Sequence, residues 1–213
     1  MRAQQVIFSL AKRIDQDDKD HIHYTSRERE GIVQASSLLV AQLLGGGAQA
    51  SSTGSQAAAP VQQFSSLQLG LMTWSLSKLV GVDSRVRSSQ TRQLVDAIAG
   101  HAGNSSVMDR PADEACRHWS RLVYSISKSG IMCSDSQAVR QVFDVAARQM
   151  PEMLQQRRPC VPQNVANPLL AYAYAEYPGS LRCYVAEIAH SLDWVMRDAK
   201  PQVSRDYSLC LQC

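Results

Sequence analysis

Residues 72–78 read Met-Thr-Trp-Ser-Leu-Ser-Lys, and residues 122–128 read Leu-Val-Tyr-Ser-Ile-Ser-Lys. Two further copies, Val-Ile-Phe-Ser-Leu-Ala-Lys at 6–12 and Pro-Leu-Leu-Ala-Tyr-Ala-Tyr at 168–174, align with them without a gap. The third position of each copy (Phe8, Trp74, Tyr124 and Leu170) holds a large apolar residue. The next three positions are small, apolar and small, and the last position is lysine or tyrosine. We interpret this self-similarity as an internal repeat.

The spacing of the copies indicates a repeat of nearly constant length. Trp74 and Tyr124 occupy the large apolar column 50 residues apart, and Leu170 follows after 46. The first interval, from Phe8 to Trp74, is 66 residues. Its excess matches residues 45–60, a segment rich in Gly, Ala, Ser and Gln and too poor in bulky apolar side chains to offset its ordering entropy. We therefore predict a disordered, low-complexity insertion there.

A second amphipathic stretch separates consecutive copies, and each such stretch begins with a helix-start signal. The expected starts are Thr25 with Glu28, Asp83 or Ser89, Ser134 with Gln137, and Ser180. Each unit is therefore predicted to consist of a helix A, which carries the motif, a turn and a helix B.

These observations predict an all-α fold, a right-handed α-solenoid of about four helix-turn-helix repeats. One helix pair cannot bury its apolar face, whereas stacked pairs bury a continuous core. The small residues let neighbouring helices pack closely, and the large residue is expected to fill the gap between units. The expected ranges are repeat 1 at 1–44, the insertion at 45–60, repeat 2 at 61–103, repeat 3 at 112–156, repeat 4 at 160–197 and a flexible tail at 198–213.

Composition favours helices but identifies no partner. Aromatic residues make up only 6%, and the formal net charge of +3 is far from that of a polybasic protein. The six widely spaced cysteines are interpreted as reduced thiols. No apolar stretch approaches the length of a membrane span, so no membrane insertion is expected.

Catalytic motifs are missing from the sequence, which favours a protein that is not an enzyme. It contains no Gly-rich phosphate loop, no HExxH and no Gly-x-Ser-x-Gly elbow. The densest polar cluster comprises Asp15, Asp17, Asp18, Asp20, His21 and His23. We interpret it as a solvated inter-helix loop rather than a metal site. No catalytic residue, metal site or cofactor is predicted.

The motif resembles helix A of the octotricopeptide repeat (OPR) family of algal organelle proteins, which typically reads PQxLANxLWALAKLG. The copies most similar to it are PQNVANPLLAYA at 162–173 and LMTWSLSKL at 71–79. A similar pattern occurs in the related FAST-kinase-like and RAP-domain proteins. The resemblance covers most of the chain apart from the insertion and the tail.

The resemblance implies sequence-selective binding of single-stranded organellar RNA, in support of transcript stability, processing, splicing or translation. It also implies a chloroplast or mitochondrial location, although no intact transit peptide is visible at the start of the sequence. Other organellar RNA-processing proteins are the further partners that it suggests.

Equivalent positions of successive A helices share one face of a solenoid, which predicts a row of Lys12, Lys78 and Lys128 suited to phosphates. Tyr174 continues this row as a base-stacking platform. The residues expected to contact base edges are Gln5, Thr73, Arg121, Asn164 and Asn167. An alternative for the lysines is that they are solvated helix ends that complement the helix dipole.

A protein-binding scaffold remains the second hypothesis. Its concave face would hold a peptide or helix of a partner. In that case the three lysines could all become glutamate without loss of the partner.

Overall fold

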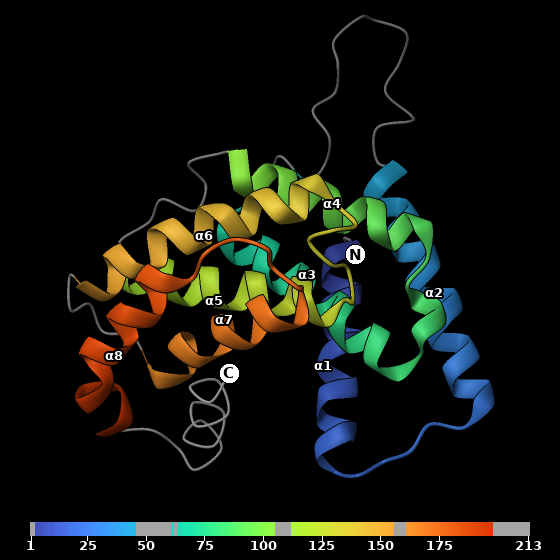
Figure 1. The fold of residues 1–213 in the computed structure, drawn as a ribbon. Helices are drawn as coiled ribbons and strands as arrows, with labels where there is room; N and C mark the ends of the chain where they lie inside the picture. The colour runs from blue at the N-terminus through green and yellow to red at the C-terminus, as the bar shows by residue number, and fades with distance from the viewer. Residues whose placement is uncertain (1–2, 46–60, 62–63, 105–111, 156–160, 198–213) are drawn as a thin grey trace, which may run out of the picture.

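The computed structural model of the protein describes residues 3–45, 61, 64–104, 112–155 and 161–197. Within these residues the fold is all-α, with eight α-helices, one short 3₁₀-helix and no strand (Figure 1). Apart from Gly45, the predicted insertion at 45–60 lies outside the described residues, as does the predicted tail at 198–213.

Two series of helices alternate along the chain. The A helices are α1 (Ala3–Lys19), α3 (Ser66–Val82), α5 (Ala112–Lys128) and α7 (Pro162–Tyr174). The B helices are α2 (Ser26–Gly45), α4 (Ser89–Asn104), α6 (Gln137–Gln155) and α8 (Arg182–Arg197), and the 3₁₀-helix η2 (Ser84–Val86) precedes α4. Each copy of the sequence motif lies in one A helix.

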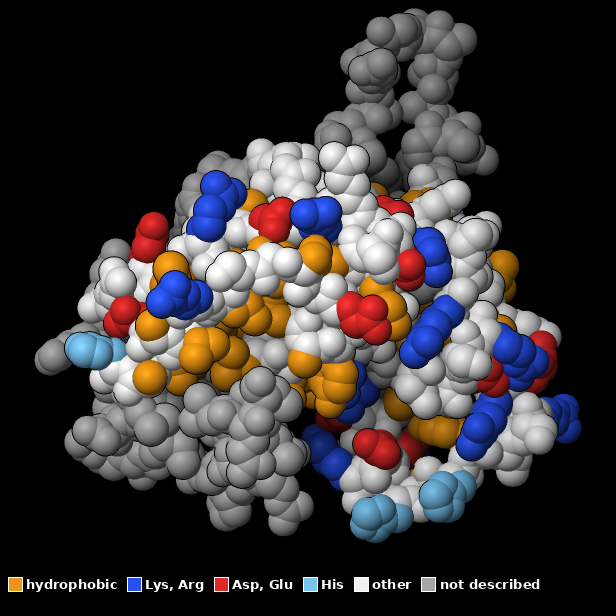
Figure 2. Space-filling model, in the orientation of Figure 1, with side chains coloured by type: hydrophobic (Ala, Val, Ile, Leu, Met, Phe, Trp, Pro, Cys, Tyr) orange, Lys and Arg blue, Asp and Glu red, His pale blue; other side chains and the backbone are white. Residues whose placement is uncertain are grey.

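The helices pack in two layers. In one layer α1 contacts α3, α3 contacts α5, and α5 contacts α7; in the other, α2 contacts α4, α4 contacts α6, and α6 contacts α8 (Figure 1). Each A helix also contacts the B helix that follows it. The face drawn in Figure 2 carries Lys and Arg interspersed with Asp and Glu over α2 and α4, whereas hydrophobic side chains gather where α6, α7 and α8 meet.

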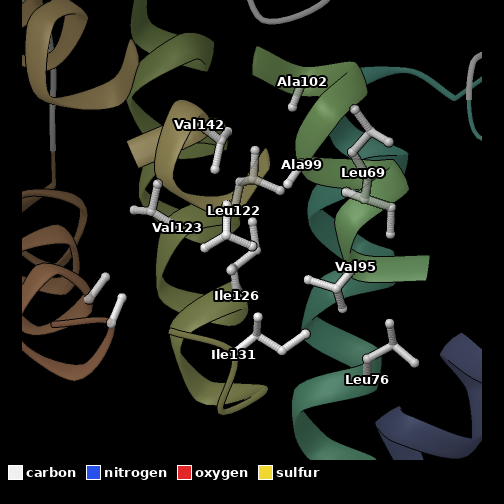
Figure 3. Packing of buried hydrophobic residues seen from close by; sticks show 14 of the residues in the cluster. Leu69, Leu76, Val95, Ala99, Ala102, Leu122, Val123, Ile126, Ile131 and Val142 are labelled. Carbon is white, nitrogen blue, oxygen red and sulfur yellow. The ribbon is translucent and has the colours of Figure 1, made fainter. Parts of the chain in front are cut away.

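The core runs continuously between the two layers. Figure 3 shows its central part, where Leu69 and Leu76 of α3 and Leu122 of α5 face Val95 and Ala99 of α4. All five side chains are fully buried. Since each fully buried aliphatic side chain contributes about 1.5–3 kcal/mol, shared burial between neighbouring pairs stabilises the stack.

The motif columns differ in how deeply they are buried. In the apolar column between the two small ones, Leu76, Ile126 and Tyr172 are 0–2% exposed and fill the interior, whereas Leu10 is only half-buried. The large column (Phe8, Trp74, Tyr124 and Leu170) is half-buried. The rings of Phe8 and Trp74 contact each other between α1 and α3, so this column partly occupies the gap between the first two units. These side chains lie at the outer edge of the A-helix layer.

The structure confirms the predicted capping box at the start of α2. The backbone N–H of Thr25 donates to Glu28 Oε2 at 2.8 Å, and the N–H of Glu28 donates to Thr25 Oγ1 at 3.4 Å. The α4 helix begins at Ser89, one of its two predicted starts, whereas Asp83 caps η2. Arg182, the first residue of α8, donates its N–H to Ser180 Oγ at 3.3 Å.

The start of α6 differs from its prediction by two residues. Ser136, rather than Ser134, accepts the N–H of Val139 at 3.1 Å. Both serines precede the helix, and only the geometry of the turn selects the one whose hydroxyl reaches an unpaired N–H.

The cysteines do not all have the predicted state. Cys116 is disulfide-bonded, which corrects the interpretation of all six as reduced thiols, whereas Cys133 and Cys183 are free. Burial raises the pKa of the Cys133 thiol to about 11, so this side chain is an unreactive core residue. None of the described helices is both long and apolar enough to cross a membrane.

The turn between α5 and α6 contacts Arg87, which lies in the second helix pair between η2 and α4. Gly130 adopts φ 75°, in the left-handed region that favours glycine, and the guanidinium of Arg87 lies where its Cβ would be. By contrast, Gly31 lies in the exposed part of α2 with open space around its Cβ position.

We expect Gly130→Ala to lower the free energy of unfolding by about 1–2 kcal/mol, because alanine is disfavoured in the left-handed region and Arg87 must move. The matched change Gly31→Ala should instead raise it by about 0.5–1 kcal/mol, since alanine is favoured inside helices. Urea denaturation followed by circular dichroism measures both. Equal effects of the two changes would contradict the turn geometry.

Candidate nucleic-acid interface

The exposed surface of the A helices repeats from one helix to the next. Three aligned positions, spaced by three and four residues, lie on the same side of each helix. They are the residue just before the motif, the large apolar residue and the final lysine or tyrosine. We call this surface the A face, and none of its residues is buried. It consists of Gln5, Leu71, Arg121 and Asn167, then Phe8, Trp74, Tyr124 and Leu170, then Lys12, Lys78, Lys128 and Tyr174.

Aromatic rings contact one another and a cation along the A face. The ring centroids of Phe8 and Trp74, on neighbouring helices, are 5.9 Å apart with an interplanar angle of 54°. The Nζ of Lys128 lies 4.0 Å from the ring centroid of Tyr174 and 5.5 Å from that of Tyr124. Both distances are within the range of a cation–π interaction. The predicted lysine and tyrosine positions therefore meet across α5 and α7.

The three predicted lysines have different surroundings. Lys12 is exposed, and no ion pair involves it among the described residues. Lys78 is half-buried, and its Nζ lies 2.5 Å from Asp15 Oδ1 on α1. Asp15 also binds Lys19, with Nζ 2.7 Å from Oδ2. Lys19 and Lys78 hold the pKa of the Asp15 carboxyl below its usual value. The charge of Lys78 is therefore partly compensated, whereas that of Lys12 is not.

The predicted base-reading residues also divide into two groups. Gln5 is exposed, and Arg121, Asn164 and Asn167 are half-buried. Thr73 is only 1% exposed, and its hydroxyl donates to the carbonyl oxygens of Leu69 and Gly70, each at 3.1 Å. Its side chain does not reach the A face, and we leave it out of the candidate interface.

Arg121 bridges two A helices. Its Cδ lies against Gly70 on α3, 3.3 Å from where a Cβ would be. Burial lowers the pKa of the Arg121 guanidinium, and the nearby charge of Arg117 adds to this effect. Because a guanidinium stays charged in proteins, two neighbouring cations remain on this part of the surface. Both favour an anionic ligand such as phosphate.

The predicted acidic loop begins later than expected. Asp15, Asp17 and Asp18 lie within α1, which ends at Lys19. Asp17 is buried and bound by Arg13 Nε at 2.9 Å and by the hydroxyl of Tyr24 at 2.7 Å. Burial and this hydrogen bond raise the pKa of Tyr24 to about 12. Asp17 therefore closes the turn to α2, and the described residues contain no group of three His, Cys, Asp or Glu side chains arranged for a metal.

Two contributors to the A-helix surface are not among the residues predicted from the sequence. Gln4 and Gln68 line a pocket between α1 and α3 together with Gln5 and Phe8. A signal for Gln68 was present, because Ser65 and Gln68 have capping-box spacing and form both reciprocal hydrogen bonds. Nothing in the sequence marked Gln4, whose role depends on its neighbour across the helix interface.

We predict that Lys78→Met raises the pKa of Asp15 toward its usual value, because one of its two cationic partners is lost. The Lys78–Asp15 pair stabilises the fold above the usual pKa of aspartate, and this contribution is lost as the pH falls through the lowered pKa. NMR titration of the Asp15 carboxyl carbon measures the shift. Lys12→Met, which removes a lysine not paired with Asp15, should leave the titration unchanged; an equal shift in both variants would disprove the pairing.

No protein family, curated protein or solved structure matches the chain. Its function must therefore be inferred from the chemistry of the A face.

Proposed function

We propose that the protein binds single-stranded RNA across its A face. The observation that carries this proposal is the repetition of rings and cations at equivalent positions of neighbouring A helices. It includes the Phe8–Trp74 pair and Lys128 over Tyr174. Single-stranded RNA presents unstacked bases, which stack on aromatic side chains, and phosphates, which attract lysine and arginine.

The repeat spacing would place the rings and lysines at regular intervals along a bound strand. A right-handed α-solenoid would carry the three columns along one continuous wall, with one set of contacts per helix pair. The half-buried rings have exposed edges or faces for stacking, and Lys12, Lys78 and Lys128 lie one helical turn further along. Rings and ammonium groups at adjacent turns can contact the bases and backbone of the same strand.

The resemblance to octotricopeptide repeats supports the finer part of the proposal. We infer a role in transcript stability, processing, splicing or translation in a chloroplast or mitochondrion, together with other RNA-processing proteins. The exposed carboxamide of Gln5 and the half-buried Asn164 and Asn167 provide donors and acceptors for base edges.

A protein-binding scaffold is the alternative, and one observation favours it. A groove of about 290 Å³ between α1 and α2 is lined by Leu10, Ile14, Ile32 and Ala35 among others. Apolar grooves of this kind accept amphipathic helices. In this alternative the A-face lysines make no contribution to partner binding.

The combined change Lys12→Gln, Lys78→Gln and Lys128→Gln should weaken binding to a labelled 12-nucleotide RNA. It should also reduce the magnitude of the slope of log affinity against log salt by about 2, since each phosphate contact contributes about 0.7 for a single strand. Fluorescence anisotropy between low and moderate salt measures both.

The matched control removes the same charge from the B helices, through Arg92→Gln, Arg140→Gln and Arg148→Gln, all at exposed positions. It should change the salt slope much less. No salt-dependent binding by the unmodified protein, or equal losses in the two triple variants, would refute the RNA-binding face.

Tyr174→Ala should weaken RNA binding by about 1–3 kcal/mol if the ring stacks on a base. Tyr174→Phe keeps the ring and should bind nearly as well as the unmodified protein. Tyr174 is 48% exposed, so neither change should much affect thermal stability. Equal affinities of the alanine and phenylalanine variants would show that the ring makes no stacking contact.

A further inference from the structure

A pocket of about 200 Å³ opens on the A-helix layer between α1 and α3. Its apolar walls include Phe8, Leu71 and Met72, and its polar lining includes the side chains of Gln4, Gln5 and Gln68. The Phe8 ring, which forms part of this wall, is also the ring that contacts Trp74. We call this space the α1–α3 pocket. Its combination of flat apolar walls and carboxamides suits a small planar heterocycle.

The carboxamides of the pocket have unused hydrogen-bonding capacity. Gln4 Oε1 is buried without a hydrogen-bond partner among the described residues. A buried unpaired acceptor costs about 1–3 kcal/mol, so turning toward a donor in the pocket would relieve this cost. Gln68 Oε1 is occupied by the N–H of Ser65 at 2.8 Å, which leaves its Nε2 as the group that can donate. Gln5 is exposed and can reorient.

The equivalent space between α3 and α5 is filled differently. By motif alignment, Gly70 corresponds to Gln4 and Arg121 corresponds to Leu71. There the side chain of Arg121 lies directly over Gly70. The gap between α1 and α3 is therefore a pocket lined by carboxamides, whereas the gap between α3 and α5 holds a guanidinium side chain.

We propose that the α1–α3 pocket binds one adenine base of the RNA, an inference that rests on the proposed RNA-binding function. The exocyclic amino group of adenine supplies the donor that Gln4 Oε1 lacks, and an adjacent ring nitrogen accepts from a glutamine Nε2. Carboxamides pair with adenine in this two-point manner. A purine presents a larger ring surface than a pyrimidine to the apolar walls formed by Phe8, Leu71 and Met72, and can therefore bury more area against them.

The test compares fluorescein-labelled rA12 and rU12 binding to the whole chain at one moderate salt concentration. The unmodified protein should bind rA12 more tightly. Gln4→Leu removes the carboxamide but keeps the side-chain volume, and should reduce the preference about tenfold, mainly by weakening rA12 binding. The change should not destabilise the fold, because it replaces a buried unpaired polar group. Gln42→Leu, at an exposed position of α2, is the control and should leave the preference unchanged.

The outcomes separate this inference from the function on which it rests. Salt-dependent binding of both RNAs with equal affinity, or a Gln4→Leu variant that retains the full adenine preference, would overturn the adenine pocket alone. Equal weakening of rA12 and rU12 by Gln4→Leu would also overturn it. Failure of the unmodified protein to bind either RNA would overturn the RNA-binding function and the pocket together.

Discussion

The close approach of one A helix to the next is the constraint on which the structure depends. Each helix pair has an apolar face that only a neighbouring pair can bury, and the small motif columns make that contact possible. Ser75 and Ser125 are almost completely buried between A helices. Ser75 can be buried because its hydroxyl donates to the carbonyl oxygen of Leu71, one turn earlier in the same helix, at 2.8 Å. A serine at this position thus costs little and keeps the helices close.

Close helix packing also fixes the register of the A face. The residues one position before the first small column lie at the outer edge of the layer. There they remain half-buried, as Phe8 and Trp74 are. The lysine column follows one turn later along each helix. The A face is therefore a consequence of core packing, and its spacing cannot change without changing the core.

The sequence was sufficient to predict the all-α class, since period and small-residue columns are local signals. It was less informative about which side of a helix is buried. Leu76 and Ile126 fill the core, whereas the larger Trp74 is half-buried at its edge, and residue size alone does not predict this division. Thr73 was assigned to the surface as a polar residue, but it satisfies its hydroxyl on its own helix. Such residues are indistinguishable from surface ones until the neighbouring helix is placed.

Some positions of the A helices are the same in successive repeats, and others differ from one repeat to the next. The small columns and the lysines recur on α1, α3 and α5, and in the proposed function the lysines would supply a general attraction for phosphate. The gaps between A helices vary, with Gln4 and Gln68 bordering one and Gly70 and Arg121 occupying the next. In the proposed function, selectivity for a particular base would therefore arise in the gaps, and the constant columns would supply affinity for any single strand.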